Sequence, residues 1–532
     1  MIKRYYCFYF TSERVIVMAI SALDKIDMNK FVYGDESFNF IPAPYVLNSP
    51  ADQNDFHNTL IHIQQHKNPK ISRDKYLKRL SMVETILPDQ IKTAQTILES
   101  PKKNAKSWSS NYGTHGWHRY VGRFPPHLVR ALLNYFQADS NDIVLDPFVG
   151  SGTTLVECRL LGIPAIGIEI CPLSAMISRS KSQYTLEMAD YLPELIAEFE
   201  EFYKTSWANF IGTRDLATVS YEEIIARPGN YIEAFTNYEK WFIKEALLGV
   251  SIAIEFATRL NGNLKDLFLV ALSSKMRSIG NVDVDVVRAE YSKKPREKVD
   301  VLDLVVKQLK KMRKSIIDSY MSHSDFILDK DSIKVIENDV LQVNDIDNES
   351  ISFIITSPPY GVEAISYLRT HLLSYRTLDH FLGVDPYKFG ANVIGSEYLP
   401  SEVPEVTDFE VAKISKTYRD FFDQVLKNNL NKNMKVRTLM MMKFFEDMRK
   451  VAERFQKWLK TGGKVAFVIG NNKIGNTIIP TDKIISEIFQ WYRLDLIKSI
   501  NHKLKSNNSN SKVPWQDRII QDEFILIFQK AG

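Results

Sequence analysis

The segment from 141 to 170 limits the fold most, because it has the pattern of a strand, a glycine loop, a helix and a second strand. NDIVLDPF is β-rich, GSGTT follows it, TTLVECRLLG is helical in character, and IPAIGIEI is a second apolar run. Thr154 and Glu157 predict a capping box, and Gly162 predicts the end of the helix. Two strands joined by such a helix lie parallel in one sheet, so an α/β fold is expected.

Two long helical stretches interrupt this sheet. Later strands are predicted at IKVIENDVLQ, SISFIITSPPY, KVAFVIGN, RLDLIKSIN and EFILIFQK. The predicted organisation is a mostly helical N-terminal extension (1–110), a first part of the core with the glycine loop (111–184), a helical insertion (185–330), core with the SPPY corner (331–360), a second helical insertion (361–460) and closing strands (461–532).

Composition excludes several classes of protein. The chain has 532 residues and a formal net charge of +4, which permits a nucleic-acid partner without requiring one. Its three cysteines have neither metal-ligand spacing nor the pattern of a disulfide framework. We therefore expect no metal, and we expect a location in the reducing cytoplasm. No apolar stretch approaches the length of a membrane span, so no membrane partner is expected.

The glycine loop has the chemistry of a nucleoside site. Gly150 and Gly152 allow backbone N–H groups to approach a ligand at the start of a helix. Glu169, at the end of the second strand, stands where a ribose diol is bound in such folds. Asp146 would repel a pyrophosphate but attract an amino group, so S-adenosylmethionine fits better than a dinucleotide. The alternatives are a plain tight turn and a Glu169 that only caps its strand.

The second unusual feature is ISFIITSPPY at 351–360, a strand that runs into two prolines. Pro358 and Pro359 make a stiff corner with projecting carbonyl groups. A carbonyl and the Ser357 hydroxyl can accept hydrogen bonds from an exocyclic amine of a base, which aims the nitrogen lone pair at a methyl group. Tyr360 can stack on the base. An ordinary turn is the alternative, but both segments follow strands of one sheet and should face one cleft.

These segments together resemble the amino-methylating DNA methyltransferases, which modify N4 of cytosine or N6 of adenine. The resemblance rests on DPFVGSGTT (146–154), GIEI (167–170) and TSPPY (356–360). GWHRYVGRFPPHLVRALL (116–133) is similar to the family's FP-containing segment, and VIENDV (335–340) to its acidic adenine-contacting segment. The resemblance implies a Rossmann-like class I S-adenosylmethionine-dependent methyltransferase sheet, here with two helical insertions and an N-terminal extension.

The resemblance also implies residue roles. The methionine end of the cofactor would be held by the loop, the ribose by Glu169 and the adenine by Asp339. The implied cofactor-binding set is Phe124, Asp146, Phe148, Gly150, Gly152, Thr153, Glu169 and Asp339. The implied catalytic set, which would hold the target base, is Ser357, Pro358, Pro359 and Tyr360.

The expected activity is site-specific methylation of double-stranded DNA, at N4 of cytosine because SPPY is associated with that target in the family. The expected setting is a modification or restriction-modification system, with a cognate restriction endonuclease as a further partner. N6-adenine methylation, RNA base-amine methylation and a non-catalytic DNA-binding subunit are the alternatives. No Pro-Cys pair is present, so C5 methylation is set aside. Residues 185–330 or 361–460 would read the DNA sequence.

Overall fold

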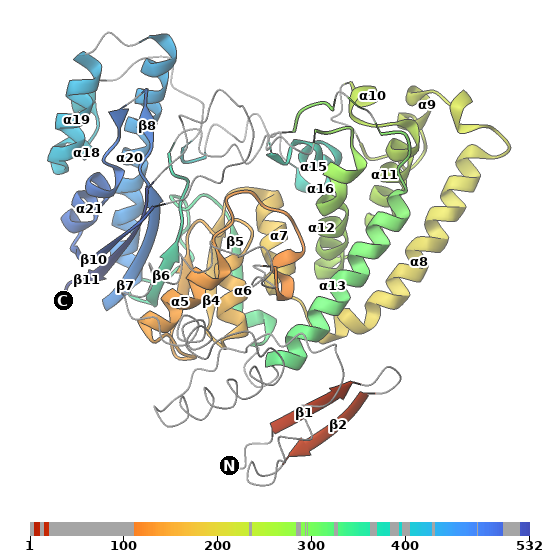
Figure 1. Ribbon diagram of the computed structural model, residues 1–532, viewed down its shortest axis with the longest axis horizontal. Coiled ribbons are helices and arrows are strands. Elements are labelled where there is room, and N and C mark those ends of the chain that lie inside the picture. Colours follow the sequence, from red (N-terminus) through yellow and green to blue (C-terminus); the bar gives the residue numbers. More distant parts are fainter. Residues whose placement is uncertain are drawn as a thin grey trace, which may run out of the picture. The chain divides into compact units, whose positions relative to one another are not determined.

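The computed structural model contains two compact units, residues 1–86 and 87–532. In the first unit, strands β1 (Tyr5–Phe10) and β2 (Val15–Ile20) pair antiparallel, with Tyr5 opposite Ile20. The helices predicted for the N-terminal extension lie outside the described residues. The structure describes residues 5–10, 15–20, 111–232, 237–283, 289–292, 294, 296–323, 328–361, 370–383, 393–395, 405–427, 431–475, 477–503 and 522–532 (Figure 1).

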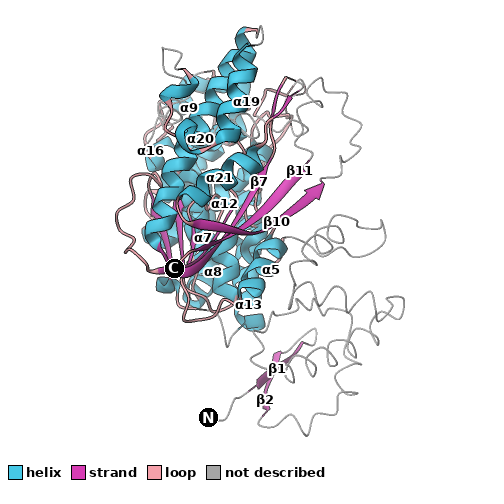
Figure 2. Cartoon of the chain, turned by 90° about the vertical axis from the view of Figure 1, so that its left-hand side faces the viewer, coloured by secondary structure: helices cyan, strands magenta, loops and turns pink. Residues whose placement is uncertain are grey.

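The second unit is built on a seven-stranded sheet with the order β10-β11-β7-β6-β3-β4-β5. Strands β7, β6, β3, β4 and β5 are parallel neighbours, whereas β11 runs antiparallel to both β7 and β10. Figure 2 shows β10 and β11 beside β7. The strands are β3 (Val144–Asp146), β4 (Ala165–Glu169), β5 (Ile333–Glu337), β6 (Ile351–Thr356), β7 (Leu459–Gly470), β10 (Leu494–Lys503) and β11 (Asp522–Lys530).

Helices cover both faces of this sheet. Leu145, Ile354 and Phe467 are buried in one apolar cluster with α20 (Lys432–Trp458) and α21 (Thr481–Trp491). The other face packs against α5 (Pro126–Phe136), α6 (Thr153–Leu160) and α7 (Pro172–Ser182). Burial on both faces explains why central strands such as β6 have nearly continuous apolar sequences rather than alternating patterns.

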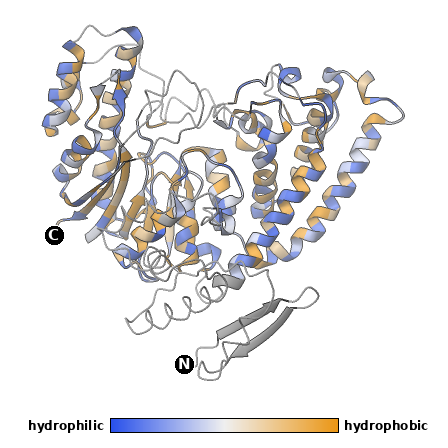
Figure 3. Cartoon of the chain, viewed as in Figure 1, coloured by the Kyte–Doolittle hydropathy of each residue, from blue (hydrophilic) through white to orange (hydrophobic). Residues whose placement is uncertain are grey.

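The first helical insertion packs around a second apolar core, to which α7 also contributes. Hydrophilic and hydrophobic residues alternate along its longest helices in Figure 3, as expected for helices with one buried face. Its elements are α8 (Leu186–Ile211), η3 (Leu216–Thr218), α9 (Tyr221–Ile225), α10 (Tyr238–Trp241), α11 (Lys244–Ala257), α12 (Gly262–Ile279) and α13 (Val301–His323), with η2 (Gly113–Gly116) before the core and η4 (Lys330–Ser332) after the insertion.

The second insertion adds short helices between β6 and β7. They are α15 (Leu372–Thr377), α16 (Asp379–Leu382), η6 (Val406–Asp408), α18 (Val411–Ile414) and α19 (Lys416–Lys427), followed by the long α20. Strands β8 (Lys473–Ile474) and β9 (Thr477–Ile478) form a small hairpin after β7. The predicted fold class, a Rossmann-like α/β sheet with helical insertions, is confirmed. Within the described residues, no helix combines the length and apolar character needed to cross a membrane.

Helix α6 corrects one local prediction. Its end is as predicted: Gly162 has a positive φ of 74°, and Ile163 N–H donates to the Cys158 carbonyl at 2.9 Å. The predicted capping box is wrong, because α6 begins after Gly152 without a side-chain cap. Thr154 instead donates from Oγ1 to Asp146 at 2.6 Å, and Glu157 accepts from residues outside the helix.

Candidate active site

The glycine loop connects the carboxyl end of β3 to the start of α6. Gly150 and Gly152 have positive φ angles of 53° and 85°, which favour glycine. A Cβ on Gly152 would lie 2.7 Å from Ser178 Oγ on α7, so the loop is held directly against that helix. This close approach fixes the backbone N–H groups at the start of α6.

Asp146 is the buried end of β3 and binds three protein donors. Its Oδ1 accepts from Thr356 Oγ1 at 2.7 Å and from Phe148 N–H at 3.1 Å, and its Oδ2 accepts from Thr154 Oγ1 at 2.6 Å. Burial raises the pKa of Asp146 to about 6, although these hydrogen bonds act in the opposite direction. The bond from Thr356 joins the glycine loop to the strand that carries the SPPY corner.

Glu169 ends β4 and is also buried. Its Oε2 accepts from Gly150 N–H and its Oε1 from Cys171 N–H, both at 2.8 Å. Burial raises the pKa of Glu169 to about 7, and the hydrogen bonds from Cys171 and Gly150 only partly offset this. Glu169 therefore does cap its strand, and each carboxylate oxygen keeps a further lone pair for another donor.

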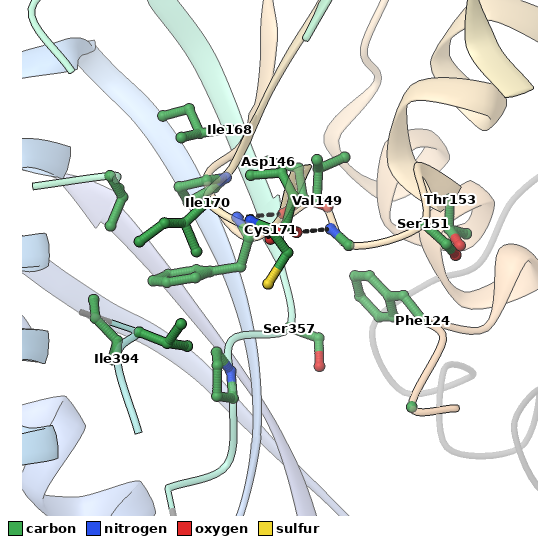
Figure 4. A pocket seen from close by; sticks show the side chains of 18 of the residues that line it. Phe124, Asp146, Val149, Ser151, Thr153, Ile168, Ile170, Cys171, Ser357 and Ile394 are labelled. Atoms are coloured by element: carbon green, nitrogen blue, oxygen red, sulfur yellow. Dashed lines mark hydrogen bonds between the residues drawn. The ribbon is translucent and has the colours of Figure 1, made fainter. Parts of the chain in front are cut away.

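One pocket, with about 820 Å³ of space partly open to solvent, lies at these strand ends (Figure 4). Most of the residues singled out in the sequence line it together: Phe124, Asp146, Phe148, Gly150, Thr153, Glu169, Asp339, Ser357 and Pro359. Gly152, Pro358 and Tyr360 are not part of the lining.

Two buried hydroxyl groups in the lining have no hydrogen-bond partner among the described residues. They are Ser151 Oγ in the glycine loop and Thr153 Oγ1 at the first residue of α6, and Figure 4 shows the two side chains close together beside Phe124. Buried hydroxyl groups are normally bonded, so a ligand group is expected to complete them. Hydroxyl and N–H donors at a helix N-terminus suit an anion such as a carboxylate.

Phe124 and Asp339 complete the other walls of the pocket. Phe124 precedes α5, where Pro126 occupies the first turn, and its side chain is buried. Asp339 is half-buried and accepts from Leu341 N–H at 2.9 Å, while its neighbour Asn338 donates from its backbone to the Glu169 carbonyl at 3.0 Å. The adjacent backbone bond places Asp339 next to the end of β4.

The SPPY corner follows β6 directly. Ser357 Oγ donates to Tyr360 Oη at 3.1 Å, and Tyr360 Oη donates to Glu523 Oε1 at 2.6 Å. Asn472 Nδ2 donates to the Tyr360 carbonyl at 3.2 Å. Ser357 lines the pocket, whereas Tyr360 does not, and the Tyr360 hydroxyl contacts Glu523 of β11. Pro358 is buried beneath the corner.

Sequence reasoning missed several residues around the pocket. Ser151 and Thr356 adjoin predicted residues, and their hydroxyl groups were the available signal. Glu523 and Asn472 come from strand ends far along the chain, and no local pattern points to them. Within the described residues, no group of three or more histidine, cysteine, aspartate or glutamate side chains is arranged to hold a metal ion.

The basic segment KQLKKMRK at 307–314 lies on α13, where several of its cations have intramolecular partners. Lys307 pairs with Asp303 at 2.7 Å, Lys311 donates to the Gly116 carbonyl at 2.8 Å, and Arg313 donates to the Ala189 carbonyl at 2.9 Å. Lys311 and Arg313 thus bond to neighbouring backbone, whereas Lys307 remains 71% exposed on the solvated face of the helix.

Comparisons with known proteins agree with this geometry. The family model N6_N4_Mtase, described as DNA methylase, matches residues 10–175, which include the glycine loop and Glu169 but not the SPPY corner. The Type II methyltransferase M.BsoBI of Geobacillus stearothermophilus is 24% identical over 463 residues, 79% of this chain and 86% of that protein. The Type II methyltransferase M.MvaI of Kocuria varians is 25% identical over 419 residues, 75% of this chain and 86% of that protein.

A shorter similarity joins the chain to an RNA enzyme. The tRNA (guanine(10)-N2)-dimethyltransferase of Methanocaldococcus jannaschii is 43% identical over 51 residues, which are 10% of this chain and 14% of that protein. This similarity is limited to a small part of both chains, whereas the two Type II methyltransferases align along most of their length.

Proposed function

Because the chain belongs to the amino-methylating DNA methyltransferases, we propose that it transfers a methyl group from S-adenosylmethionine to N4 of cytosine at a specific site in double-stranded DNA. One observation carries the proposal: the glycine loop, the carboxylates of Asp146 and Glu169, and Ser357 line the same pocket. A cofactor site and an amine-accepting corner are thus within reach of one another, as direct methyl transfer requires.

The lining fits the polar groups of S-adenosylmethionine. The N-terminus of α6 suits its carboxylate, as do the hydroxyl groups of Ser151 and Thr153, which have no partner among the described residues. Asp146 and Glu169, buried without a salt bridge among the described residues, suit its cationic groups and ribose diol. When bound, the cofactor supplies a methyl group on a sulfonium. Phe124 and Phe148 exclude water, and Asp339 is assigned to the adenine amine.

The SPPY corner would hold the target amine. Ser357 Oγ accepts one N–H of the amine, and a proline carbonyl of the corner accepts the other, which directs the nitrogen lone pair toward the methyl group. Base stacking by Tyr360 stays a prediction, because Tyr360 is not part of the pocket lining. A base in a duplex cannot enter such a pocket, so the cytosine is flipped out, at a cost of about a few kcal/mol.

The choice of N4 of cytosine rests on the serine of TSPPY and separates this proposal from N6-adenine methylation. Because two relatives are named Type II methyltransferases, we extend the proposal to a modification or restriction-modification system, with a cognate endonuclease as partner. The helical insertions, 185–330 and 361–460, are the two candidates for reading the DNA sequence.

The test is to incubate purified protein with mixed-sequence duplex DNA and labelled S-adenosylmethionine, digest the DNA to nucleosides and identify the labelled nucleoside by mass spectrometry. N4-methylcytosine is expected. N6-methyladenine would keep the enzyme class and overturn the assigned base. Label found only in an RNA control would favour the activity named for the short tRNA-methyltransferase similarity.

A matched variant separates chemistry from cofactor binding. Ser357→Ala should lower the single-turnover methylation rate by about 100-fold, because one preorganised acceptor is lost. Its affinity for S-adenosylmethionine, measured by isothermal titration calorimetry, should stay within about twofold of wild type, since the loop and both carboxylates are unchanged. Equal loss of binding and rate would assign a structural role to the corner.

A further inference from the structure

We infer that Glu523 is a positioning residue for methyl transfer. Through Tyr360 it makes Ser357 a hydrogen-bond acceptor toward the base, and it receives the proton that the reaction releases. This inference rests on the proposed function and adds a residue from β11, a strand that no motif connects to the active site. Glu523 lies 163 positions from Tyr360, and its carboxylate Oε1 is 2.6 Å from the Tyr360 hydroxyl oxygen.

The direction of each hydrogen bond follows from the carboxylate. A carboxylate only accepts, so the Tyr360 hydroxyl must donate its single proton to Glu523. Tyr360 Oη is then an acceptor for its other neighbour, and the Ser357 hydroxyl donates to it at 3.1 Å. With its proton committed in this way, Ser357 Oγ presents lone pairs to the remaining space, which is the pocket that it lines.

The position of Tyr360 is fixed from two strands. Asn472, just after β7, donates to the Tyr360 carbonyl at 3.2 Å, and Glu523 on β11 accepts from the side chain of the same residue. Strands β7 and β11 are paired, with Glu523 opposite Gly470, so both contacts move with one part of the sheet. The ring of Tyr360 also packs against the apolar cluster that contains α20 and α21.

This polarity selects the chemical class of the target. An acceptor at Ser357 Oγ binds an exocyclic amine, which has N–H groups to donate, and repels a base carbonyl at the same position. Leaving two acceptors opposed in a buried site costs about 1–3 kcal/mol, enough to discriminate an amine from a carbonyl. Glu523 thereby contributes to substrate choice without touching the substrate.

The same contacts give the released proton a route out. The new N–C bond takes its methyl group from the sulfonium, whose C–S electron pair stays on sulfur, and the amine nitrogen loses one proton. That proton passes to Ser357 Oγ as the serine proton moves to Tyr360 Oη and the tyrosine proton moves to Glu523. Glu523 is half-buried and can release the proton to solvent, which restores the starting arrangement.

A double-mutant cycle tests the inference. Glu523→Gln can present an N–H to Tyr360, and Tyr360→Phe keeps the ring but removes the hydroxyl. Each should lower the single-turnover methylation rate by about 100-fold. The double variant should be within about twofold of the slower single variant, because both act through one hydrogen bond. Glu523→Asp should recover part of the rate, and S-adenosylmethionine affinity should not change.

Glu349→Gln is the matched control. Glu349 pairs with Lys530 of β11 at 3.1 Å and does not line the pocket, so the rate of this variant should equal that of wild type. Additive losses in the cycle, or a Glu523→Gln rate within twofold of wild type, would overturn the inference while the wild-type enzyme still methylates DNA. If Glu523→Gln does not fold, Tyr360→Phe alone decides: a rate within twofold of wild type overturns the inference. No methylation by wild type would instead reject the proposed function.

Discussion

Two buried glutamates, Glu157 on α6 and Glu169 at the end of β4, have pKa values shifted in opposite directions. Burial alone would raise the pKa of Glu157, but the Arg130 guanidinium and the His115 contact hold it at about 2. Burial raises the pKa of Glu169 to about 7, because only neutral hydrogen-bond donors of Cys171 and Gly150 oppose it. A buried carboxylate with an ionic partner is typical of a structural role, whereas one that lines a pocket without an ionic partner is a candidate ligand-binding group.

The surroundings of the two carboxylates explain the difference. Glu157 accepts from Arg130 Nε and His115 Nε2, both at 2.6 Å, and from Tyr112 Oη at 2.5 Å. None of these three residues lines the pocket. Glu169 is bonded to the backbone of the glycine loop and faces the pocket, where bound donors would complete its hydrogen bonds.

The largest expected effect on stability comes from breaking the ion pair between Glu157 and Arg130. Glu157→Gln should lower the free energy of unfolding by about 3–5 kcal/mol, because it leaves the Arg130 charge buried without a counter-charge. Urea denaturation of the cofactor-free protein measures this. The double variant Glu157→Leu, Arg130→Met should recover much of the loss. A single-variant loss below about 1 kcal/mol would show that the pair has no such role.

The next prediction concerns the pH dependence of stability. The folded-state pKa of Glu169, about 7, exceeds its ordinary value of 4.5, so the folded state binds the proton more tightly. Its contribution is therefore lost as pH rises from about 4.5 to about 7, by about 3 kcal/mol. Glu157 acts oppositely, because its contribution is present above 4.5 and is lost as pH falls toward about 2.

The variant Glu169→Gln isolates the contribution of Glu169 to the pH dependence of stability. The difference in unfolding free energy between this variant and wild type should change by about 3 kcal/mol between pH 5 and pH 8, with wild type relatively more stable at pH 5. Denaturant titrations at four pH values would show it. A difference that does not vary with pH would mean that Glu169 titrates alike in the folded and unfolded chains.

Cofactor affinity should show a smaller effect. If the ribose and cationic groups need the Glu169 carboxylate, S-adenosylmethionine should bind about tenfold more weakly at pH 6 than at pH 8, since the pKa is about 7. Asp146, whose pKa is about 6, adds to the loss at lower pH. Titration calorimetry measures it, and Glu169→Gln should bind weakly with little change over this range. PH-independent binding by wild type would contradict the assigned role.

The smallest expected effect on stability concerns buried cations, which can be compared in the same way as the two glutamates. Lys181 on α7 is buried, its amino group has no partner among the described residues, and burial beside Arg123 lowers its pKa to about 7. Lys181→Met removes a donor without an acceptor, so stability at pH 8 should rise by about 1 kcal/mol. Arg130→Met, which removes a paired cation, should instead lower it. Equal losses would show that pairing does not distinguish the two sites.

Much of the fold follows from local patterns. The run from Val144 to Glu169 is a contiguous unit of strand, loop and helix, so its periodicity, its glycines and the stop at Gly162 were sufficient to predict it. The capping-box pattern failed at Glu157 because Arg130, on another helix, offers a charged partner that outcompetes a local N–H.

The site was predictable where its residues adjoin motifs and not beyond them. Asp146, Glu169 and Ser357 end parallel strands, and parallel strand ends meet at one edge of a sheet. The contact of the Tyr360 hydroxyl with Glu523 depends on the pairing of two distant strands, which sets the position of Glu523. Such pairing has no local signature in a single sequence.

Strand β11 also bears on how the molecule is made. It comes after β10 along the chain, yet it lies between β10 and β7 in the sheet. The other six strands of the sheet are therefore synthesised before β11, which joins β10 to the rest of the sheet and carries Glu523. During synthesis, β10 has no partner in this sheet and the Tyr360 hydroxyl lacks its acceptor. Methyl transfer competence should thus appear only late, after β11 has inserted between two strands that were already synthesised.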